Sequence, residues 1–402
     1  VLFRSKETTT QPLMDSHLVW AYLVKNLEQC KDNLPVITDS NRDLYYGRCS
    51  QGFAYALLAR LYLNAPSYIT YESGSNDFLT TLTADTTAVK LLTEAGVSIT
   101  SESDFYTRAA TCCEKIISTQ AGEYSISSDF FANYKIDNQN SLENIFVIVE
   151  DGRANFDYRD YAGNMANKLR ITMLTLHYNH QNTWNLIEKP WNGFAARPDF
   201  IKLYNEEDVR GPGNEGQGTK NKSQWGWFVG PVYDAKGEKQ QKDENDTLVN
   251  IRPEIRSLSD ATWNDGARMF KYEVDKSATY KFCENDFVLL RYADVLWMKA
   301  EALLRAGQSV DALVADADFQ RMRTRVGLTP YTAADLTLDE IYDERGREFA
   351  WEMTRRRDMI RFGTFDKGGY GFAQPTEAYR KWFPINTDIL ETEPRWKQNP
   401  GY

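Results

Sequence analysis

Apolar residues recur at helical spacing in three stretches near the start of the chain. In residues 15–33 they fall three or four positions apart, at Leu18, Val19, Tyr22, Leu23 and Leu27. Residues 103–119 repeat this amphipathic pattern. Residues 50–65 differ, because small side chains form one stripe at Ala54, Ala56 and Ala59. We predict three helices, and the small stripe indicates that the second helix approaches another helix closely.

Helical periodicity returns after residue 286. Residues 287–306 and 309–325 are predicted as helices, and a long helix covers about 339–362. The small residues Ala300, Gly307 and Ala312 fit a helix–turn–helix repeat of the tetratricopeptide type. In that repeat a small residue on the first helix packs against one twelve positions later. The helices at 50–65 and 103–119 form a similar pair, separated by a polar insertion.

The middle of the chain, from about residue 150 to 286, lacks helical periodicity. Gly, Asn and Pro are frequent there, and the best strand candidate, Ile145–Val149, lies just before it. A stretch of about 130 irregular residues is too long for a simple loop. We therefore expect an elaborated region that carries short strands and the function.

The end of the chain is aromatic and stiff. It carries Trp382, Phe383, Trp396 and Tyr402, with prolines at 384, 394 and 400. Because proline favours extended or turn conformations, this segment has little helix propensity. We expect a strap that packs its rings on the folded body.

Composition narrows the classes of function. The 402 residues are 42% hydrophobic and 26% charged, which is typical of a globular protein, and the net charge is −10. That charge makes nucleic acid and anionic lipid poor partners. The sequence contains no run of about 18 apolar residues, so no membrane span is predicted, and no signal peptide is visible. The chain is therefore cytoplasmic, or its true N-terminus is missing.

Three stretches together resemble the SusD/RagB family of Bacteroidetes nutrient-binding lipoproteins. The first is Arg291-Tyr292-Ala293 followed by Ala300-Glu301-Ala302. The second, "DERGREFAWEMTRRRDMIRFG", carries Glu344, Arg345, Glu348, Glu352, Arg355, Asp358 and Arg361. The third is the end, "FPINTDILETEPRWKQNPGY", in which Asn386 and Glu393 depart slightly from the family pattern. The resemblance covers about 50–402.

The resemblance implies a mostly α fold with tetratricopeptide-like helix pairs and a large irregular insertion carrying short strands. We expect a single SusD-like domain over 1–402. Its helical scaffold is 13–120 and 287–362, its ligand-binding region is 121–286, and its C-terminal strap, packed on the body, is 363–402. Family members begin with a signal peptide, a lipid-bearing Cys and further helices, so we expect this chain to be N-terminally incomplete.

The implied function is surface binding of oligosaccharides and their delivery to a SusC-like TonB-dependent transporter. The family is not enzymatic, and its members are surface-exposed lipoproteins of the outer membrane. Membrane contact would then come only through a lipid anchor absent from this chain. One alternative is a cytoplasmic helical-repeat scaffold that binds proteins.

A second alternative is a glycoside hydrolase, which needs two carboxylates as acid and base. Glu344, Glu348 and Glu352 stand at i, i+4 and i+8 on one predicted helix. The same pattern also suits a ladder of ion pairs with the arginines of that helix, Arg345, Arg347, Arg355 and Arg356, and places Asp358 near Arg361. We favour ion pairs and expect no catalytic residue.

Aromatic residues of the irregular region are the candidate ligand-binding residues. Sugar rings stack their C–H faces on flat aromatic side chains, and loops on a rigid scaffold are where such a surface would lie. Trp225 and Trp227 are the first choice, because in an extended segment both point to the same side. The other candidates are Trp184, Trp263 and Tyr233. We interpret Trp191, in "PWNGF", as a structural residue.

Metal sites are weakly indicated. His177 and His180 have a helical ligand spacing, but no third ligand is evident. The acidic run at 205–208 suits either Ca²⁺ or a solvated loop. The odd set of five cysteines contains no CxxC, and we interpret it as small buried hydrophobes. We expect no cofactor, with Ca²⁺ as the open alternative.

Overall fold

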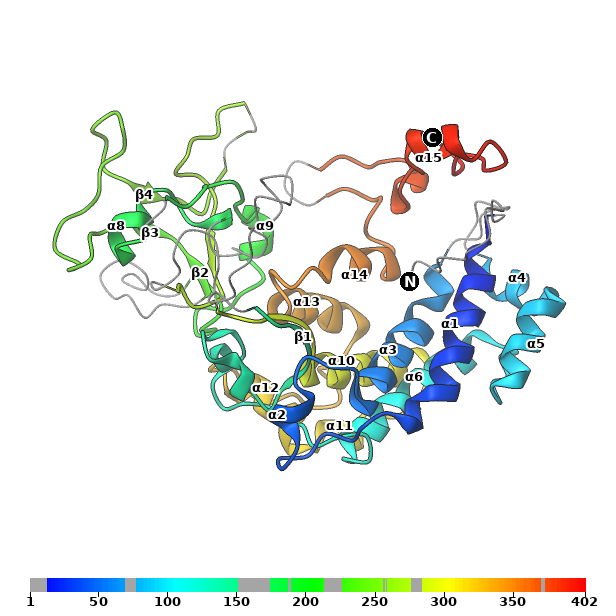
Figure 1. Ribbon diagram of the computed structural model, residues 1–402. Helices are drawn as coiled ribbons and strands as arrows, with labels where there is room; N and C mark the ends of the chain where they lie inside the picture. Colours follow the sequence, from blue (N-terminus) through cyan, green and yellow to red (C-terminus); the bar gives the residue numbers. More distant parts are fainter. Residues whose placement is uncertain are drawn as a thin grey trace.

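The computed structural model describes residues 13–68, 77–150, 174–186, 189–212, 226–255, 257, 259–275, 284–369 and 373–402. A body of packed helices fills the lower half of the view in Figure 1, and the strand-bearing insertion lies to its upper left. The helices are α1 (Ser16–Cys30), α2 (Arg42–Tyr45), α3 (Gln51–Asn64), α4 (Phe78–Ala84), α5 (Thr86–Glu94), α6 (Glu102–Ile117), α8 (His180–Trp184), α9 (Pro198–Ile201), α10 (Tyr292–Arg305), α11 (Asp311–Val314), α12 (Ala317–Thr324), α13 (Leu338–Glu348), α14 (Arg355–Arg361) and α15 (Thr387–Thr392). The strands are β1 (Asn144–Ile148), β2 (Gly226–Phe228), β3 (Gly230–Pro231), β4 (Asn250–Ile251), β5 (Arg268–Phe270) and β6 (Phe287–Arg291).

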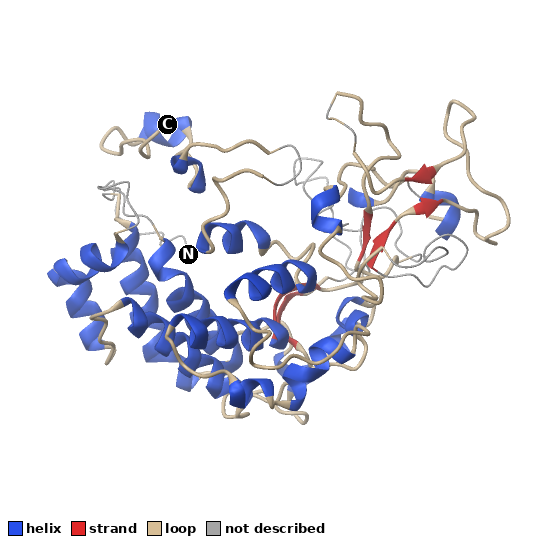
Figure 2. Cartoon of the chain, turned by 180° about the vertical axis from the view of Figure 1, so that it is seen from behind, coloured by secondary structure: helices blue, strands red, loops and turns tan. Residues whose placement is uncertain are grey.

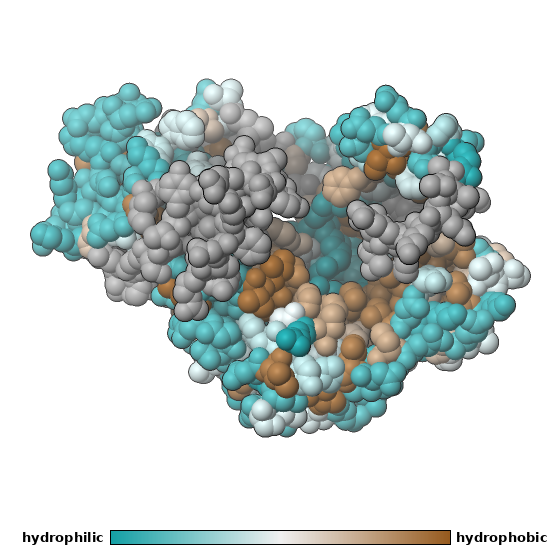
Figure 3. Space-filling view, in the orientation of Figure 1, coloured by the Kyte–Doolittle hydropathy of each residue, from teal (hydrophilic) through white to brown (hydrophobic). Residues whose placement is uncertain are grey.

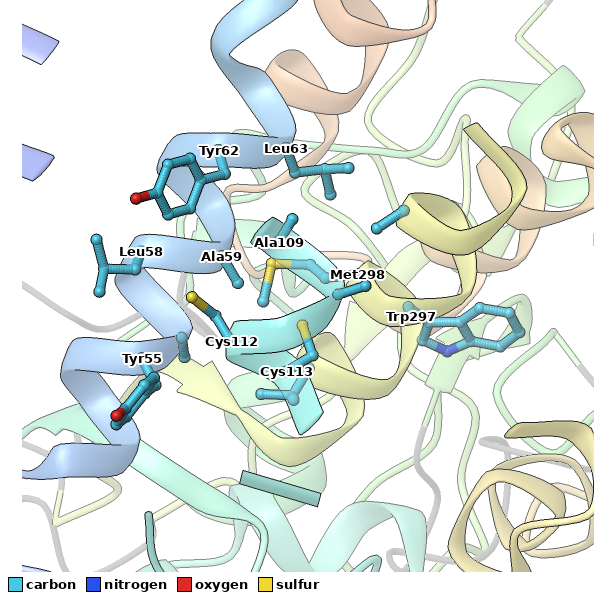
Figure 4. Packing of buried hydrophobic residues seen from close by; sticks show 14 of the residues in the cluster. Tyr55, Leu58, Ala59, Tyr62, Leu63, Ala109, Cys112, Cys113, Trp297 and Met298 are labelled. Carbon is cyan, nitrogen blue, oxygen red and sulfur yellow. The ribbon is translucent and has the colours of Figure 1, made fainter. Parts of the chain in front are cut away.

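The core of the helical body lies between α3, α6 and α10. Ala54, Ala56 and Ala59 on α3 are fully buried, and α3 packs closely on α6 as predicted. Figure 4 shows Cys112 and Cys113 of α6 between the α3 side chains and Trp297 of α10. The expected pairing of α3 and α6 is confirmed, and the fold is mostly helical.

The predicted helix at 287–306 is wrong at its start. Residues 287–291 form β6, which pairs antiparallel with β1, and the helix α10 begins only at Tyr292. The apolar run of β6 is buried by this pairing, which a local helical pattern cannot reveal. The strand predicted at 145–149 is confirmed as β1.

Of the predicted tetratricopeptide pair after residue 287, α10 packs on α12 through Trp297 and Phe319, whose ring centroids lie 5.2 Å apart. Ala300 is buried, whereas Ala312 is exposed. The segment predicted as one helix over 309–325 is divided into α11 and α12. Asp316 divides it, because its carboxylate accepts hydrogen bonds from the backbone N–H groups of Asp318 and Phe319 and so caps α12. Helix α10 packs mainly on α6, α3 and α13.

The long helix predicted over 339–362 is broken between α13 and α14. Trp351 and Met353 adopt left-handed backbone conformations, with φ of +67° and +58°. These conformations are strained for bulky side chains. Glu352 between them is buried, and its carboxylate accepts hydrogen bonds from Tyr134 Oη at 2.9 Å and Arg291 Nε at 3.0 Å. The break therefore delivers one carboxylate to the interior.

The insertion carries two of the three two-stranded sheets, β2–β5 and β3–β4 (Figure 2). Its core is an apolar cluster of Leu176, Trp184, Phe228, Val232, Val249, Ile251, Phe270 and Val274. The expected short strands are confirmed. Hydrophilic residues cover the outer part of the insertion, whereas apolar residues gather over the helical body on the face in Figure 3. Among the described helices, none is long and apolar enough to cross a membrane.

Cysteine burial is mixed. Cys112 and Cys113 are buried as predicted, and burial raises the pKa of both thiols. Cys30 and Cys49 are exposed, which corrects the expectation for them, while Cys283 lies outside the described residues.

The C-terminal segment from residue 373 closes largely on itself. Trp382 Nε1 donates to the Pro400 carbonyl at 3.2 Å, and Tyr402 Oη donates to the Trp382 carbonyl at 2.8 Å. Its contacts with the body include Arg356, which lies over the Phe383 ring at 4.4 Å and donates to the Lys381 carbonyl at 2.9 Å. Phe383 and Tyr402 are nonetheless 68% and 46% exposed, so the expectation that the strap buries its rings is wrong for these two, whereas Trp382 and Trp396 are half-buried.

Removing residues 382–402 should therefore have a small effect. The truncation deletes the Arg356–Phe383 contact, which is worth about 0.5–1 kcal/mol at an exposed site. We expect the free energy of unfolding to fall by no more than about 1 kcal/mol, measured by urea denaturation. A loss of several kcal/mol would show that the segment is tightly docked after all.

Candidate functional site

Two of the predicted ligand-binding residues, Trp184 and Trp227, are buried in the structure. Trp227 on β2 is 7% exposed and packs edge-on against Phe200, with the ring centroids 5.9 Å apart. Trp184 on α8 is 6% exposed and packs on Phe270 at 4.7 Å. Both rings fill apolar clusters of the insertion and offer no open face to a ligand. Trp225 lies outside the described residues.

The other two predicted residues are more accessible. Tyr233 is half-buried, and its backbone carbonyl accepts a hydrogen bond from Thr183 Oγ1 at 2.6 Å. Trp263 is 62% exposed, and its ring meets the edge of Tyr178 at a centroid distance of 6.5 Å. Trp263 is thus the predicted residue that the structure leaves open for stacking.

Two further exposed rings lie on a neighbouring segment. Trp191 and Phe194 are both more than half exposed. Asn192 between them donates a hydrogen bond from Nδ2 to the Trp263 carbonyl at 3.0 Å. We call Tyr178, Trp191, Phe194 and Trp263 the aromatic surface. Sequence reasoning missed Tyr178 and Phe194 and interpreted Trp191 as structural, although the Asn-Gly turn in "PWNGF" was a signal for an exposed loop.

A buried arginine holds these segments together. Arg268 on β5 donates to the Trp263 carbonyl at 2.7 Å, to Asn192 Oδ1 at 2.9 Å and to the Asp265 carbonyl at 2.8 Å. Burial lowers the pKa of Arg268 to about 10, so the guanidinium remains charged at neutral pH. The Asn192 backbone N–H also donates to the Leu176 carbonyl at 3.0 Å, which joins the Tyr178 segment to this frame. Exposed rings on a fixed frame lose little entropy when a ligand stacks on them.

The carboxylates of α13 are not arranged for acid–base catalysis. Glu344 contacts Arg210 at 2.7 Å, and Glu348 contacts Arg291 and Arg325 at 2.6 Å each. Although burial by itself raises it, the surrounding guanidinium groups hold the pKa of Glu348 well below its ordinary value. A general acid at neutral pH needs a raised pKa. Ion pairs therefore occupy these carboxylates as expected, but among the predicted partners Arg345, Arg347, Arg355 and Arg356 only Arg347 pairs with one of the three glutamates, and Arg345 pairs with Asp294 and Asp358 instead.

Most partners of these carboxylates come from distant segments, which the sequence analysis did not foresee. Arg210 lies in the insertion, Arg291 at the end of β6 and Arg325 after α12. Within the helix segment itself, the pairs Arg347–Glu344 at 2.7 Å and Arg361–Asp358 at 2.8 Å are formed. Arg355 instead donates to the Tyr342 carbonyl and Arg356 to the Lys381 carbonyl.

The two candidate metal motifs, His177/His180 and the acidic run at 205–208, lie in environments that do not form a metal site. His177 and His180 are fully buried, and the His180 ring lies among Trp184, Phe228 and Phe270. In the acidic run at 205–208, both Asp208 carboxylate oxygens accept hydrogen bonds from Arg210. The part of the chain that the structure describes contains no group of three or more His, Cys, Asp or Glu placed to hold a metal ion.

Comparison with known proteins agrees with this architecture. Residues 151–402, more than half of the chain, match the SusD family profile. The starch-binding protein SusD of Bacteroides thetaiotaomicron is 29% identical over 166 residues, which are 38% of this chain and 29% of that protein. The match therefore spans less than a third of that relative's length.

Solved structures share the fold. Surface glycan-binding protein A from Bacteroides thetaiotaomicron aligns with a TM-score of 0.64 at 21% identity, covering 95% of this chain and 70% of that one. The protein of the same name from Bacteroides uniformis aligns with a TM-score of 0.63 at 18% identity, covering 98% and 71%. The family profile, the curated relative and the fold lead to one assignment: this chain belongs to the SusD family.

Proposed function

We propose that this protein binds oligosaccharides at the surface of the outer membrane, as a lipid-anchored protein, and delivers them to a SusC-like TonB-dependent transporter. Membership of the SusD family supports this. Among structural relatives, surface glycan-binding protein A from Bacteroides thetaiotaomicron has been solved in complex with laminarihexaose. A second relative is described as a laminarin-binding SusD-like protein. We expect binding without catalysis.

The observation that carries the proposal on this chain is the exposure of Trp263 within the aromatic surface. Its ring is 62% exposed while its backbone is fixed by Arg268 and Asn192. Stacking of a sugar on such a ring is worth about 1–2 kcal/mol, by analogy with base stacking. With two to four rings, affinity should lie in the micromolar to millimolar range.

Replacing Trp263 with alanine should weaken glycan binding about tenfold, because it removes the most exposed ring of the surface. The ligand is first identified on a panel of plant, host and microbial glycans, and affinities are then measured by isothermal titration. Phe383→Ala is the matched control, since Phe383 is equally exposed but lies in the C-terminal segment. Trp225→Ala tests the predicted residue outside the described ranges.

Equal affinities for Trp263→Ala and the wild type would contradict the aromatic surface as the binding site. A loss confined to Trp225→Ala would move the site to that segment. Delivery is tested separately, by co-purification of the full-length protein with a SusC-like transporter from the same organism. If the protein binds glycan but does not co-purify with a transporter, the proposed binding stands and the proposed delivery is contradicted.

A further inference from the structure

The connection between α13 and α14 lies where the helical body meets the insertion (Figure 1). Trp351 in this connection is half-buried and packs on two apolar clusters, one around Tyr134 and one around Trp227. Its ring also meets the ring of Phe194, with the centroids 5.9 Å apart and the ring planes at 70°. Since Phe194 belongs to the aromatic surface, Trp351 continues that surface onto the helical body.

Met353 is 77% exposed, more than any other large apolar side chain in the described part of the chain. It follows Trp351 by two residues, so the two Cα atoms are no more than about 7.6 Å apart. The side chains of Glu352 and Thr354 on either side of it are buried, whereas that of Met353 projects into solvent. The fold therefore makes little use of this thioether side chain.

The backbone conformation at Met353 makes a methionine costly there. Its φ of +58° lies in the left-handed region, where a bulky side chain is strained and glycine is not. The burial of Glu352 accounts for the turn of the backbone, but glycine at 353 would allow the same turn without the strain. Strained residues cluster at sites that contact ligands. A strained and exposed methionine beside the aromatic surface therefore indicates a contact with a bound molecule.

The rings on the two sides of the boundary are held at a fixed distance. The Phe194 backbone N–H donates to the Leu174 carbonyl at 3.1 Å. On the other side, the Ala350 carbonyl, next to Trp351, accepts a hydrogen bond from the buried Lys271 Nζ at 2.9 Å. A ligand that bridges the two rings does not need to order either segment, which lowers the entropic cost of binding.

A chain of neighbouring residues links Trp263 to Met353. The Trp263 carbonyl accepts a hydrogen bond from Asn192 Nδ2 at 3.0 Å, and Asn192 precedes Phe194 by two residues. Phe194 contacts Trp351, which precedes Met353 by two residues. The exposed groups of the insertion and those of the helical body are thus parts of one surface.

We propose that the glycan-binding surface crosses from the insertion to the helical body and takes an extended oligosaccharide, longer than a disaccharide. The inference rests on the proposed function and names the ligand of the same site. One sugar stacks on Trp263, the chain passes over Phe194, and its far end lies on Trp351 and Met353. The C–H groups of a sugar contact the thioether through dispersion, and the flexible, polarisable side chain of methionine suits a curved ring face.

Isothermal titration of the full-length protein with oligosaccharides of increasing length tests the assignment. The probes are glucose, laminaribiose, laminaritetraose and laminarihexaose, and the corresponding malto-, cello-, xylo- and manno-oligosaccharides. In the series that binds, we expect the hexasaccharide to bind at least about tenfold more tightly than the disaccharide, because only the longer chain reaches from Trp263 to Met353. Trp263→Ala should weaken binding at every length.

Met353→Gly should reduce hexasaccharide affinity at least about threefold and leave disaccharide affinity unchanged. The same variant should unfold at a higher urea concentration than the wild type, because glycine relieves the strained φ. A loss of affinity then cannot come from a loss of folding. Met353→Leu keeps an apolar side chain and should bind as the wild type does. Met14→Gly is the matched control, since Met14 is an exposed methionine outside this surface and its loss should leave binding unchanged.

The outcomes separate this inference from the proposed function. Equal affinity for disaccharide and hexasaccharide would limit the site to the insertion, and unchanged hexasaccharide affinity in Met353→Gly would remove the helical body from it. Lower stability of Met353→Gly would mean that the methionine serves the fold instead of a ligand. In each of these cases, weaker binding in Trp263→Ala would leave the proposed function standing. Failure of every probe to bind would contradict the proposed function itself.

Discussion

Replacing Glu348 with glutamine should lower the free energy of unfolding by about 3–5 kcal/mol, because it leaves buried guanidinium groups without a counter-charge. Glu348 is fully buried and contacts Arg291 and Arg325 at 2.6 Å and Arg210 at 2.8 Å. Glutamine has nearly the same shape, so the variant removes the charge and little of the packing. Urea denaturation measures the change.

The matched control is Glu206→Gln, which removes a carboxylate from an exposed loop and should cost less than about 0.5 kcal/mol. A loss below about 1 kcal/mol in Glu348→Gln would contradict a structural role for the ion pairs. The same preparations should release no reducing sugar from any glycan, in the wild type as in the variant. Release by the wild-type protein would revive the glycoside hydrolase alternative.

Lowering the pH from about 6.5 to about 4 should destabilise the insertion by roughly 3 kcal/mol or more through its two buried histidines. Burial lowers the pKa of His177 from its ordinary value to about 4, with Arg268 adding to the shift and Asp243 opposing it. Burial also lowers the pKa of His180 well below the ordinary range, with smaller contributions from His177 and Arg268. The unfolded chain then binds more protons than the folded chain. The stabilisation is complete above about pH 6.5 and is lost as the pH falls toward the folded-state values.

His180→Phe should flatten this pH dependence, because phenylalanine suits the surrounding Trp184, Phe228 and Phe270 rings and cannot titrate. Tryptophan fluorescence during urea denaturation, at several pH values between about 6.5 and 4.5, gives the slope. Leu58→Ala is the control, since Leu58 lies in the core of the helical body, in a different cluster from the rings around His180, and its loss should lower stability equally at every pH. An unchanged slope in His180→Phe would mean that His180 does not contribute to the acid sensitivity.

Local pattern located most segments of the helical body, but not all of the positions where its helices begin or break. The small residues of α3 and the amphipathic pattern of α6 are short-range features that mark the buried faces of these helices. The same holds for β1, whose apolar run is bounded by polar residues. The stripe predicted for α1 is wrong, because α1 buries His17, Trp20, Ala21 and Val24 and leaves Val19, Tyr22 and Leu23 exposed. The family resemblance also rested on sequence alone, because its motifs combine residues of α10, α13, α14 and the C-terminal segment in a fixed order.

Contacts between distant segments decided what the pattern could not. Residues 287–291 are a strand because β1 lies beside them, and Arg291 at their end is buried because Glu348 and Glu352 meet it there. Trp227 and Trp263 are the same residue type in the same irregular region, yet only Trp263 is exposed. Burial of a ring depends on which segments fold over it, and this is set by the tertiary packing. The sequence by itself thus determined where most helical segments lie, the family resemblance and the aromatic content of the insertion, whereas the tertiary structure alone decided where helices give way to strand or break and which rings remain open to a ligand.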